Sequence, residues 1–181
     1  MGDPSPRTAA EPDRHGIMLE DAFTRYQSEL LGTLYYIVGN AEDARDALQE
    51  TFLKCWRASD QIGELTNLKA WVFRVALNTG RDLRKTAWKR KRQPLPSDDM
   101  MSTNTRNPPP EAAVDQQDQL ARVRRAVANL RPEEQEVFLL RQNGGLTYDQ
   151  IAEAVGAPSG TVKTRMRLAL AKLREALNVD Q

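Results

Sequence analysis

Apolar residues recur every three or four positions along most of this 181-residue chain, the spacing of helices with one buried face. The longest series runs from Leu19 to Ile37, so a helix is expected from near Met18 to Gly39. Similar series predict helices over 41–59, 68–89 and 112–130, and another from Pro132. No segment alternates apolar and polar residues as a half-buried strand does. The pattern therefore predicts an all-α protein.

A proline-rich polar segment, 93–111, interrupts this periodicity. Such a composition favours an extended, mobile linker. The charged, proline-containing stretch 1–17 is expected to be a disordered tail. We therefore expect two small helical domains, 18–92 and 112–178, joined by a flexible linker.

The segment 146–173 has the pattern of a helix-turn-helix. Ile151 lies on the first helix, Gly156 can adopt the left-handed backbone that ends it, and Pro158 opens the second. The predicted buried stripe of the second helix is Val162, Met166, Leu170 and Leu173, and its off-stripe cations are Lys163, Arg165 and Arg167. An αα-hairpin within a bundle remains an alternative, but the basic outward face favours contact with the DNA major groove.

The helix over 41–59 has one apolar and one polar face, and Asn40 can cap its start. Its expected buried stripe is Ala44, Leu48, Phe52 and either Cys55 or Trp56. Its polar face carries Asp43, Asp46, Gln49, Glu50 and Lys54. A polar face of this kind is either solvated or used to dock a partner, and the charge pattern alone does not favour docking.

Charge is distributed unevenly, although the net charge is only +1. Residues 1–60 contain six basic and eleven acidic side chains, a balance of −5, whereas 80–92 contains seven basic and one acidic, a balance of +6. The basic face of the third helix carries Arg74, Asn78, Arg81 and Lys85. Trp71 and Trp88 beside these cations suit stacking on unpaired bases, with core packing as the alternative for Trp71. An acidic end and a basic patch indicate two different partners.

Several classes of protein and site are disfavoured by what the chain contains. Cys55 is the single cysteine, so no internal disulfide can form; a small core residue is the expected role, with redox sensing as the alternative. His15 is the single histidine, so a zinc site is not expected. A metal-dependent phosphotransferase using Asp43 and Asp46 lacks a glycine-rich phosphate loop. We expect a cytoplasmic, non-enzymatic protein without metal or cofactor.

Two blocks of residues, one in each expected domain, form recognisable motifs. The first block contains Ala41-Glu42-Asp43, Gln49-Glu50-Thr51-Phe52, Trp56, Lys69-Ala70-Trp71, Ala76, Asn78, Asp82, Arg84 and Lys85. The second contains Leu130-Arg131-Pro132, Val137-Phe138, Leu146-Thr147-Tyr148, Ile151-Ala152, Gly156 and Pro158-Ser159-Gly160-Thr161-Val162-Lys163-Thr164-Arg165. Both blocks, in this order and separated by a proline-rich linker, resemble the extracytoplasmic-function (ECF) group of bacterial RNA polymerase sigma factors, and together they make the resemblance specific.

The resemblance implies a promoter-specificity subunit, with roles for three sets of residues. Those expected to bind the clamp helices of the core polymerase's largest catalytic subunit are Asp43, Asp46, Gln49, Glu50 and Phe52. Those expected to bind the minus-ten element as it opens are Glu64, Asn67, Lys69, Trp71, Arg74, Asn78, Arg81, Arg84 and Lys85. Those expected to bind the minus-thirty-five element are Ser159, Gly160, Thr161, Lys163, Thr164, Arg165 and Arg167.

The family also implies an inhibitory partner, an anti-sigma factor held between the two domains.

Leu168 and Leu170 stand where many relatives carry arginines, so fewer phosphate contacts are expected there. The loop 59–67 diverges from the family. By analogy, the overlapping segment 62–69 forms the pocket for a flipped base. The alternative function is a response-regulator-type activator with a similar helix-turn-helix. Such an activator would need a receiver domain of alternating strands and helices.

Overall fold

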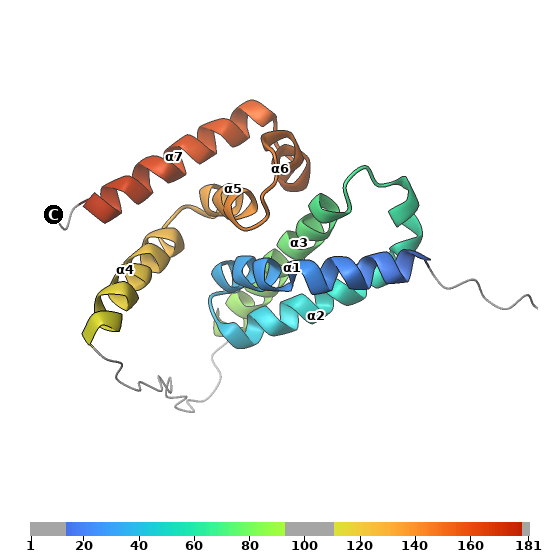
Figure 1. Ribbon diagram of the computed structural model, residues 1–181, viewed down its shortest axis with the longest axis horizontal. Helices are drawn as coiled ribbons and strands as arrows, with labels where there is room; N and C mark the ends of the chain where they lie inside the picture. The colour runs from blue at the N-terminus through green and yellow to red at the C-terminus, as the bar shows by residue number, and fades with distance from the viewer. Residues whose placement is uncertain (1–13, 93–110, 179–181) are drawn as a thin grey trace, which may run out of the picture.

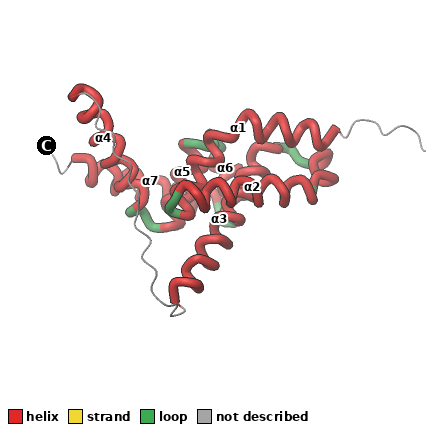
Figure 2. The backbone as a smooth tube through the Cα atoms, turned by 90° about the horizontal axis from the view of Figure 1, so that it is seen from below, coloured by secondary structure: helices red, strands yellow, loops and turns green. Residues whose placement is uncertain are grey.

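The structure is a computed structural model that describes the backbone of residues 14–92 and 111–178. Every regular element within these ranges is helical, as Figure 2 shows, so the predicted all-α class is confirmed. The elements are α1 (Arg14–Val38), α2 (Ala41–Arg57), the short 3-10 helix η1 (Ser59–Glu64), α3 (Leu68–Arg92), α4 (Glu111–Ala128), α5 (Pro132–Gln142), α6 (Tyr148–Val155) and α7 (Ser159–Asn178). Residues 93–110 of the predicted linker and residues 1–13 of the predicted tail lie outside the described residues, whereas Glu111, predicted to end the linker, begins α4.

The first domain is a bundle in which α1, α2 and α3 all contact one another. Its core is formed by fully buried side chains from all three helices, among them Leu19, Leu30, Leu34, Ala44, Cys55, Val72, Phe73 and Leu77. Gly80 lets α1 and α3 approach closely, because a Cβ at this position would lie only 2.9 Å from Ile37 Cγ2. The C-terminal end of α3 extends beyond the bundle (Figure 2).

Local signals place the helix ends of this domain. Gly39 has a positive φ of 94° after α1, where a side chain would be strained. Asn40 caps α2 by accepting from the Asp43 amide at 2.8 Å, and Asn67 caps α3 in the same way at 2.9 Å from the Ala70 amide. Helix α1 begins at Arg14 rather than near Met18. Its first turn packs on η1, with His15 beside Gly63, and this contact is not visible in local sequence.

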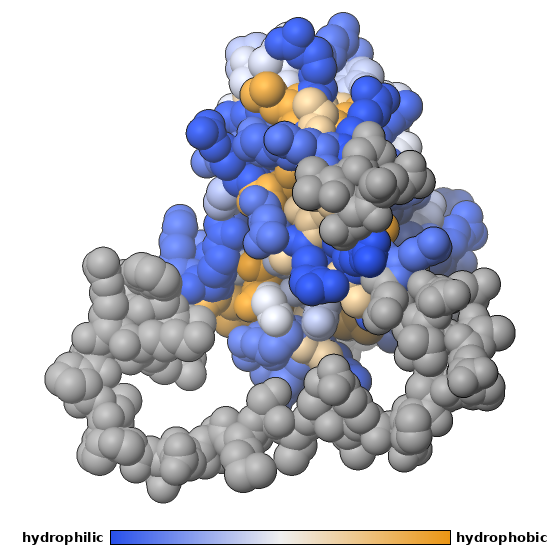
Figure 3. All heavy atoms as spheres, turned by 90° about the vertical axis from the view of Figure 1, so that its left-hand side faces the viewer, coloured by the Kyte–Doolittle hydropathy of each residue, from blue (hydrophilic) through white to orange (hydrophobic). Residues whose placement is uncertain are grey.

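Helices α4, α5, α6 and α7 form the second domain, in which α7 contacts each of the other three. Its core includes Val137, Leu139, Leu140, Leu146, Ile151, Val162 and Met166. On α7 the prediction for Leu170 was wrong: Ala169 is buried there, and Leu170 is 38% exposed. The buried positions 162, 166, 169 and 173 follow the helix period more closely than the predicted series. The side of the molecule with α4 and the end of α7 is mostly hydrophilic, with apolar residues in between (Figure 3).

The two domains lie against each other, as Figure 1 shows, with α6 on α3 and α5 on α1. Thr33 and Asn143 connect α1 with the end of α5, since the Asn143 amide donates to the Thr33 hydroxyl at 3.3 Å. Two ion pairs also link α3 with the second domain. These contacts decide which of the predicted functional residues remain accessible.

Candidate polymerase-binding and DNA-binding surfaces

The polar face of α2 is open along most of its length. Asp46 and Gln49 are exposed, while Asp43, Glu50 and Phe52 are partly buried. Asp43 also accepts from the Asn40 side chain at 2.6 Å, which holds its carboxylate at the helix start. Of the two alternatives for the end of the apolar stripe, Cys55 is the buried one, whereas Trp56 is 41% exposed and lies beside the Phe52 ring.

A groove of about 390 Å³ with charged residues along its lining runs between α2 and α3 beside this face. Its lining includes Asp46 and Glu50 from α2 and Asp82 from α3. Lys54 lies 3.8 Å from Asp82 across the groove. The three carboxylates outnumber the one lysine, so the groove favours a cationic side chain from a partner.

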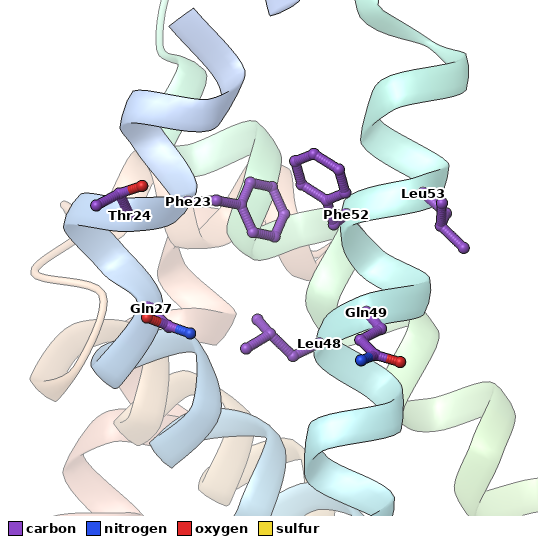
Figure 4. A pocket seen from close by; sticks show the side chains of 7 residues that line it. All are labelled: Phe23, Thr24, Gln27, Leu48, Gln49, Phe52 and Leu53. Carbon is purple, nitrogen blue, oxygen red and sulfur yellow. The ribbon is translucent and has the colours of Figure 1, made fainter. Parts of the chain in front are cut away.

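A second, mainly apolar groove of about 480 Å³ lies between α1 and α2. In Figure 4 the Phe23 and Phe52 rings point toward each other across it, and Leu48 points toward α1. The two rings meet edge to face with centroids 5.0 Å apart, a favourable arrangement for aromatic pairs. Leu53 lies on the side of α2 away from α1 (Figure 4), and Gln49, a residue of the polar face, also lines the groove, so the groove adjoins that face.

On α3, the principal cation of the predicted minus-ten surface is paired with the second domain. Arg81 donates from Nε to Glu136 Oε1 at 2.8 Å, and a second guanidinium nitrogen donates to the other carboxylate oxygen. The Glu136 side chain is only 5% exposed and that of Arg81 is 28% exposed. The hydrogen bond to Glu136 raises the pKa of the Arg81 guanidinium above its usual value, against the lowering effect of partial burial.

Two further residues of the same surface contact the second domain. Arg74 Nη1 lies 3.8 Å from Glu153 Oε1 of α6. Lys69 Nζ lies 4.6 Å from the centre of the Tyr26 ring, and a Cβ at Gly145 would be 3.6 Å from this nitrogen. Gly145 has a positive φ of 61° in the turn after α5, which brings the backbone of that turn next to Lys69.

The remaining residues predicted for the minus-ten element are distributed differently. Glu64, Asn78 and Lys85 are exposed, and Asn67 and Arg84 are partly buried. Trp71 is buried beneath α6, so in this arrangement its ring is not available to stack on a base. The side chain of Trp88 lies outside the described residues, as do those of the 89–92 basic run.

The helix-turn-helix has the local geometry that its sequence predicts. Thr147 caps α6 in a reciprocal arrangement with Gln150, in which each side chain accepts from the other's backbone amide. Gly156 ends the helix in the left-handed conformation, with φ 67° and ψ 40°. No atom lies within 4 Å of a Cβ built there, so the backbone conformation, not space, requires glycine.

The first turns of α7 present the residues predicted for the minus-thirty-five element to solvent. The exposed members are Gly160, Lys163, Thr164 and Arg167, and the partly buried members are Ser159, Thr161 and Arg165. Val162 and Met166 are buried on the opposite face and anchor the helix to the second domain. The geometry thus separates an anchoring face from a basic face, as insertion into a groove requires.

Other kinds of site find little support among the described residues. No group of His, Cys, Asp and Glu there is placed to hold a metal ion, and none of the described helices is long and apolar enough to cross a membrane. Burial raises the pKa of the Cys55 thiol to about 12. A thiol of this kind is protonated at neutral pH, so it is a core residue without the thiolate that redox sensing needs.

Sequence reasoning did not find the acidic partners of α3. Glu136 stands in a run with Glu134 and Gln135, and all three are buried. Glu134 binds Lys172 of α7 at 2.7 Å, and Gln135 donates to the Val127 carbonyl at 3.0 Å. The local sequence of α5 gave no clear signal for this pairing, because Glu134, Gln135 and Glu136 belong to a polar run that also contains the exposed Glu133.

Comparison with known proteins identifies the family of the chain. A family model described as Sigma-70 region 2 matches residues 22–93, and one described as Sigma-70, region 4 matches residues 120–173. The chain is 34% identical over 144 residues to the ECF RNA polymerase sigma factor SigL of Mycobacterium tuberculosis, with 78% of each chain covered. It is 30% identical over 189 residues to the ECF sigma factor RpoE of Cereibacter sphaeroides, which covers 98% of this chain and 100% of that protein.

Solved structures share the fold. CnrH, solved in complex with the cytosolic domain of CnrY, has a TM-score of 0.65 at 24% identity and covers 92% of this chain and 99% of its own. The sigma factor RpoE of Bartonella quintana, solved with the anti-sigma factor NepR, has a TM-score of 0.66 at 22% identity, with 91% and 99% covered. Together with the sequence matches, they show that the chain belongs to the ECF family of RNA polymerase sigma factors, proteins that direct the core polymerase to promoters.

Proposed function

We propose that this sigma factor uses α2 to bind the core polymerase, α3 to bind the minus-ten element and the start of α7 to bind the minus-thirty-five element. The observation that supports this most directly is the separation of charge. The α2 face carries Asp46 and Glu50, and Asp82 of α3 adds a third carboxylate to the groove between the two helices. The basic residues that we assign to DNA lie on another face of α3 and on the start of α7. A polyanion such as DNA and a cationic partner surface can therefore bind at the same time. The protein would act in the cytoplasm and without catalysis of its own.

On α2, the polar face and the two adjoining grooves form one continuous candidate surface for the polymerase. The acidic groove fits cationic side chains, and the apolar groove at Phe52 supplies the buried area that holds an interface together. We assign Asp43, Asp46, Gln49, Glu50 and Phe52 to this contact.

The assignment is tested by reversing charge on α2. Asp46→Lys combined with Glu50→Lys should weaken binding to core polymerase by about 2–5 kcal/mol, or at least about thirtyfold. Glu20→Lys, at an exposed position of α1, is the matched control and should leave the affinity unchanged. Equal affinity of the double variant and the control would rule out this surface.

The function as a whole is tested with the full chain and a bacterial core polymerase. Transcription from a pool of genomic fragments, followed by sequencing of the transcripts, should give a set of start sites with two shared upstream elements. Core polymerase alone is the control. No promoter-dependent transcript from an active core would contradict the proposal.

An anti-sigma factor is the further partner that we propose. It is supported by the relatives, since CnrH was solved with CnrY and the Bartonella RpoE with the anti-sigma factor NepR. Such a partner should form a stoichiometric complex with this chain and stop transcription in the reconstituted assay. A response-regulator-type activator is not favoured, because residues 14–92 contain only helices.

A further inference from the structure

The first turn of α1 packs against the turn that leads into α3. This η1–α3 turn consists of η1 and residues 65–67, and it lies beside the start of α1 (Figure 1). It contains Glu64 and Asn67, two residues of the predicted minus-ten surface, together with the exposed Gln61 and Thr66. Bases are read by polar groups held at fixed positions. The position of this turn therefore decides which bases its side chains can contact.

Local interactions hold only part of the η1–α3 turn. Its backbone hydrogen bonds are short-range, as from the Leu65 amide to the Ile62 carbonyl at 3.2 Å, and bonds of this 3-10 type have poor geometry. Among the described residues of η1, Ile62 alone is buried, so it anchors the turn to the core of the first domain. The next residue, Gly63, has no side chain with which to pack. The second half of η1 therefore depends on a contact from another element.

His15 of α1 provides this contact. A Cβ built on Gly63 would lie 3.3 Å from His15 Nε2 and 3.6 Å from Cε1, so the imidazole lies directly against the glycine. Gly63 does not have the positive φ that requires glycine at positions such as Gly156. Glycine therefore supplies space here, and not a special backbone conformation. The part of α1 that carries His15 is itself anchored, because Gly16 and Leu19 are buried.

We propose that His15 is a positioning residue for promoter recognition: it packs on Gly63 and so holds Glu64 and Asn67 in the geometry that reads the minus-ten element. The proposal rests on the assignment of this surface to the minus-ten element. It adds a residue from the stretch that the sequence predicted to be a disordered tail. Without the imidazole, Gly63 would lose its packing partner, and glycine has the greatest backbone freedom of all residues. A turn that moves contacts several bases weakly instead of one base well, so base selectivity falls.

The first experiment compares base preferences of the holoenzyme formed from the full chain and core polymerase. The templates carry a promoter found by the transcription assay, with its minus-ten and minus-thirty-five elements randomised in turn, and the transcripts are sequenced. With His15→Ala, the preference for the best base should fall about fivefold at one or two minus-ten positions, the lower end of what a base contact contributes. Preferences at the minus-thirty-five element should not change. Glu20→Ala, at an exposed position further along α1, is the control and should retain every preference.

A purely structural role of His15 would give a different result. If the imidazole only stabilised the first domain, His15→Ala would lower transcription from all templates by the same factor and leave the base preferences unchanged. That outcome would overturn the proposal. If the wild type itself showed no preference at the minus-ten positions, the assignment of this surface to the minus-ten element would fail instead.

The second experiment tests the contact between the two residues with a double-mutant cycle. Gly63→Ala should lower transcription from the preferred promoter, because its methyl group would crowd the His15 imidazole. Removal of the imidazole relieves this crowding, so Gly63→Ala should cost at least about threefold less transcription in the His15→Ala background than in the wild type. Gly160→Ala, where a Cβ meets no atom within 4 Å, is the matched control and should have the same effect in both backgrounds. Equal losses from Gly63→Ala in both backgrounds would show that the two residues do not act on each other, and the proposal would be wrong.

Discussion

Helices α3 and α7 both carry basic residues that we assign to promoter DNA, yet the surroundings of these residues in the structure are opposite. Arg74 and Arg81 on α3 are paired with carboxylates of the second domain, whereas Lys163 and Arg167 on α7 face solvent. The difference shows that a basic helix face is not by itself an available DNA-binding surface. A basic face is available to DNA only where no neighbouring element pairs its cations with acidic side chains. On α3 the second domain provides such acidic side chains.

The largest expected effect concerns the core that holds α3 in place. Phe73 is fully buried, so Phe73→Ala should lower the free energy of unfolding by about 3–5 kcal/mol and weaken every function of the first domain. Leu168→Ala, at an exposed position of α7, should change it by about 0.5 kcal/mol or less. Urea titration followed by circular dichroism measures both. Similar losses in the two variants would contradict the burial described here.

A smaller effect is expected when the cations themselves are truncated. Arg81→Ala leaves Glu136 without its partner and should weaken the contact between the domains by about 2 kcal/mol, less than for a fully buried pair because Arg81 is partly exposed. Domain separation would hydrate Glu136, so X-ray scattering should detect expansion before the helices unfold. Arg167→Ala, the exposed counterpart on α7, should cause no expansion. Expansion in both variants, or in neither, would remove the contrast between the helices.

On α7 the effect should be on DNA binding alone. Lys163→Ala should lower the affinity for a duplex carrying the minus-thirty-five element by about 1 kcal/mol, roughly fivefold. The slope of the affinity against salt concentration should also decrease by the amount expected for about one lost phosphate contact. The melting temperature should not change, because Lys163 is exposed. Fluorescence anisotropy at several salt concentrations measures the affinity. An unchanged salt slope would mean that Lys163 does not contact a phosphate.

The smallest expected effect at neutral pH is alkylation of Cys55, which lies in the core against which α3 packs. Its thiol should resist alkylation by iodoacetamide in the native protein and react only on unfolding, as mass spectrometry would show. Because the folded pKa is raised from 9.0 to about 12, the unfolded chain releases this proton first as the pH rises. The contribution of the Cys55 thiol to the free energy of unfolding is therefore fully present below pH 9 and should decline between pH 9 and 12. Rapid alkylation at pH 7 would contradict the described burial.

Much of the candidate site was accessible from sequence because it depends on short-range signals. The caps at Asn40 and Asn67, the left-handed Gly156 and the face of α7 with Lys163 and Arg167 all involve residues within a turn or two of each other. Where the predictions differed from the structure, a neighbouring helix decided the outcome. Ala169 instead of Leu170 faces the core of the second domain, and the start of α1 is extended to Arg14 by its contact with η1.

By itself the sequence determined the long helices, most of their ends, the helix-turn-helix and the family, because each follows from residue order and local backbone preferences. Only the tertiary structure decided that Arg81 lies against Glu136, 55 positions further along the chain. No local preference encodes that pairing: it arises because α5 and α6 pack across α1 and α3. The physical reason is that burial and Coulomb interactions depend on distance in space, and these set whether a basic helix faces water, DNA or its own second domain.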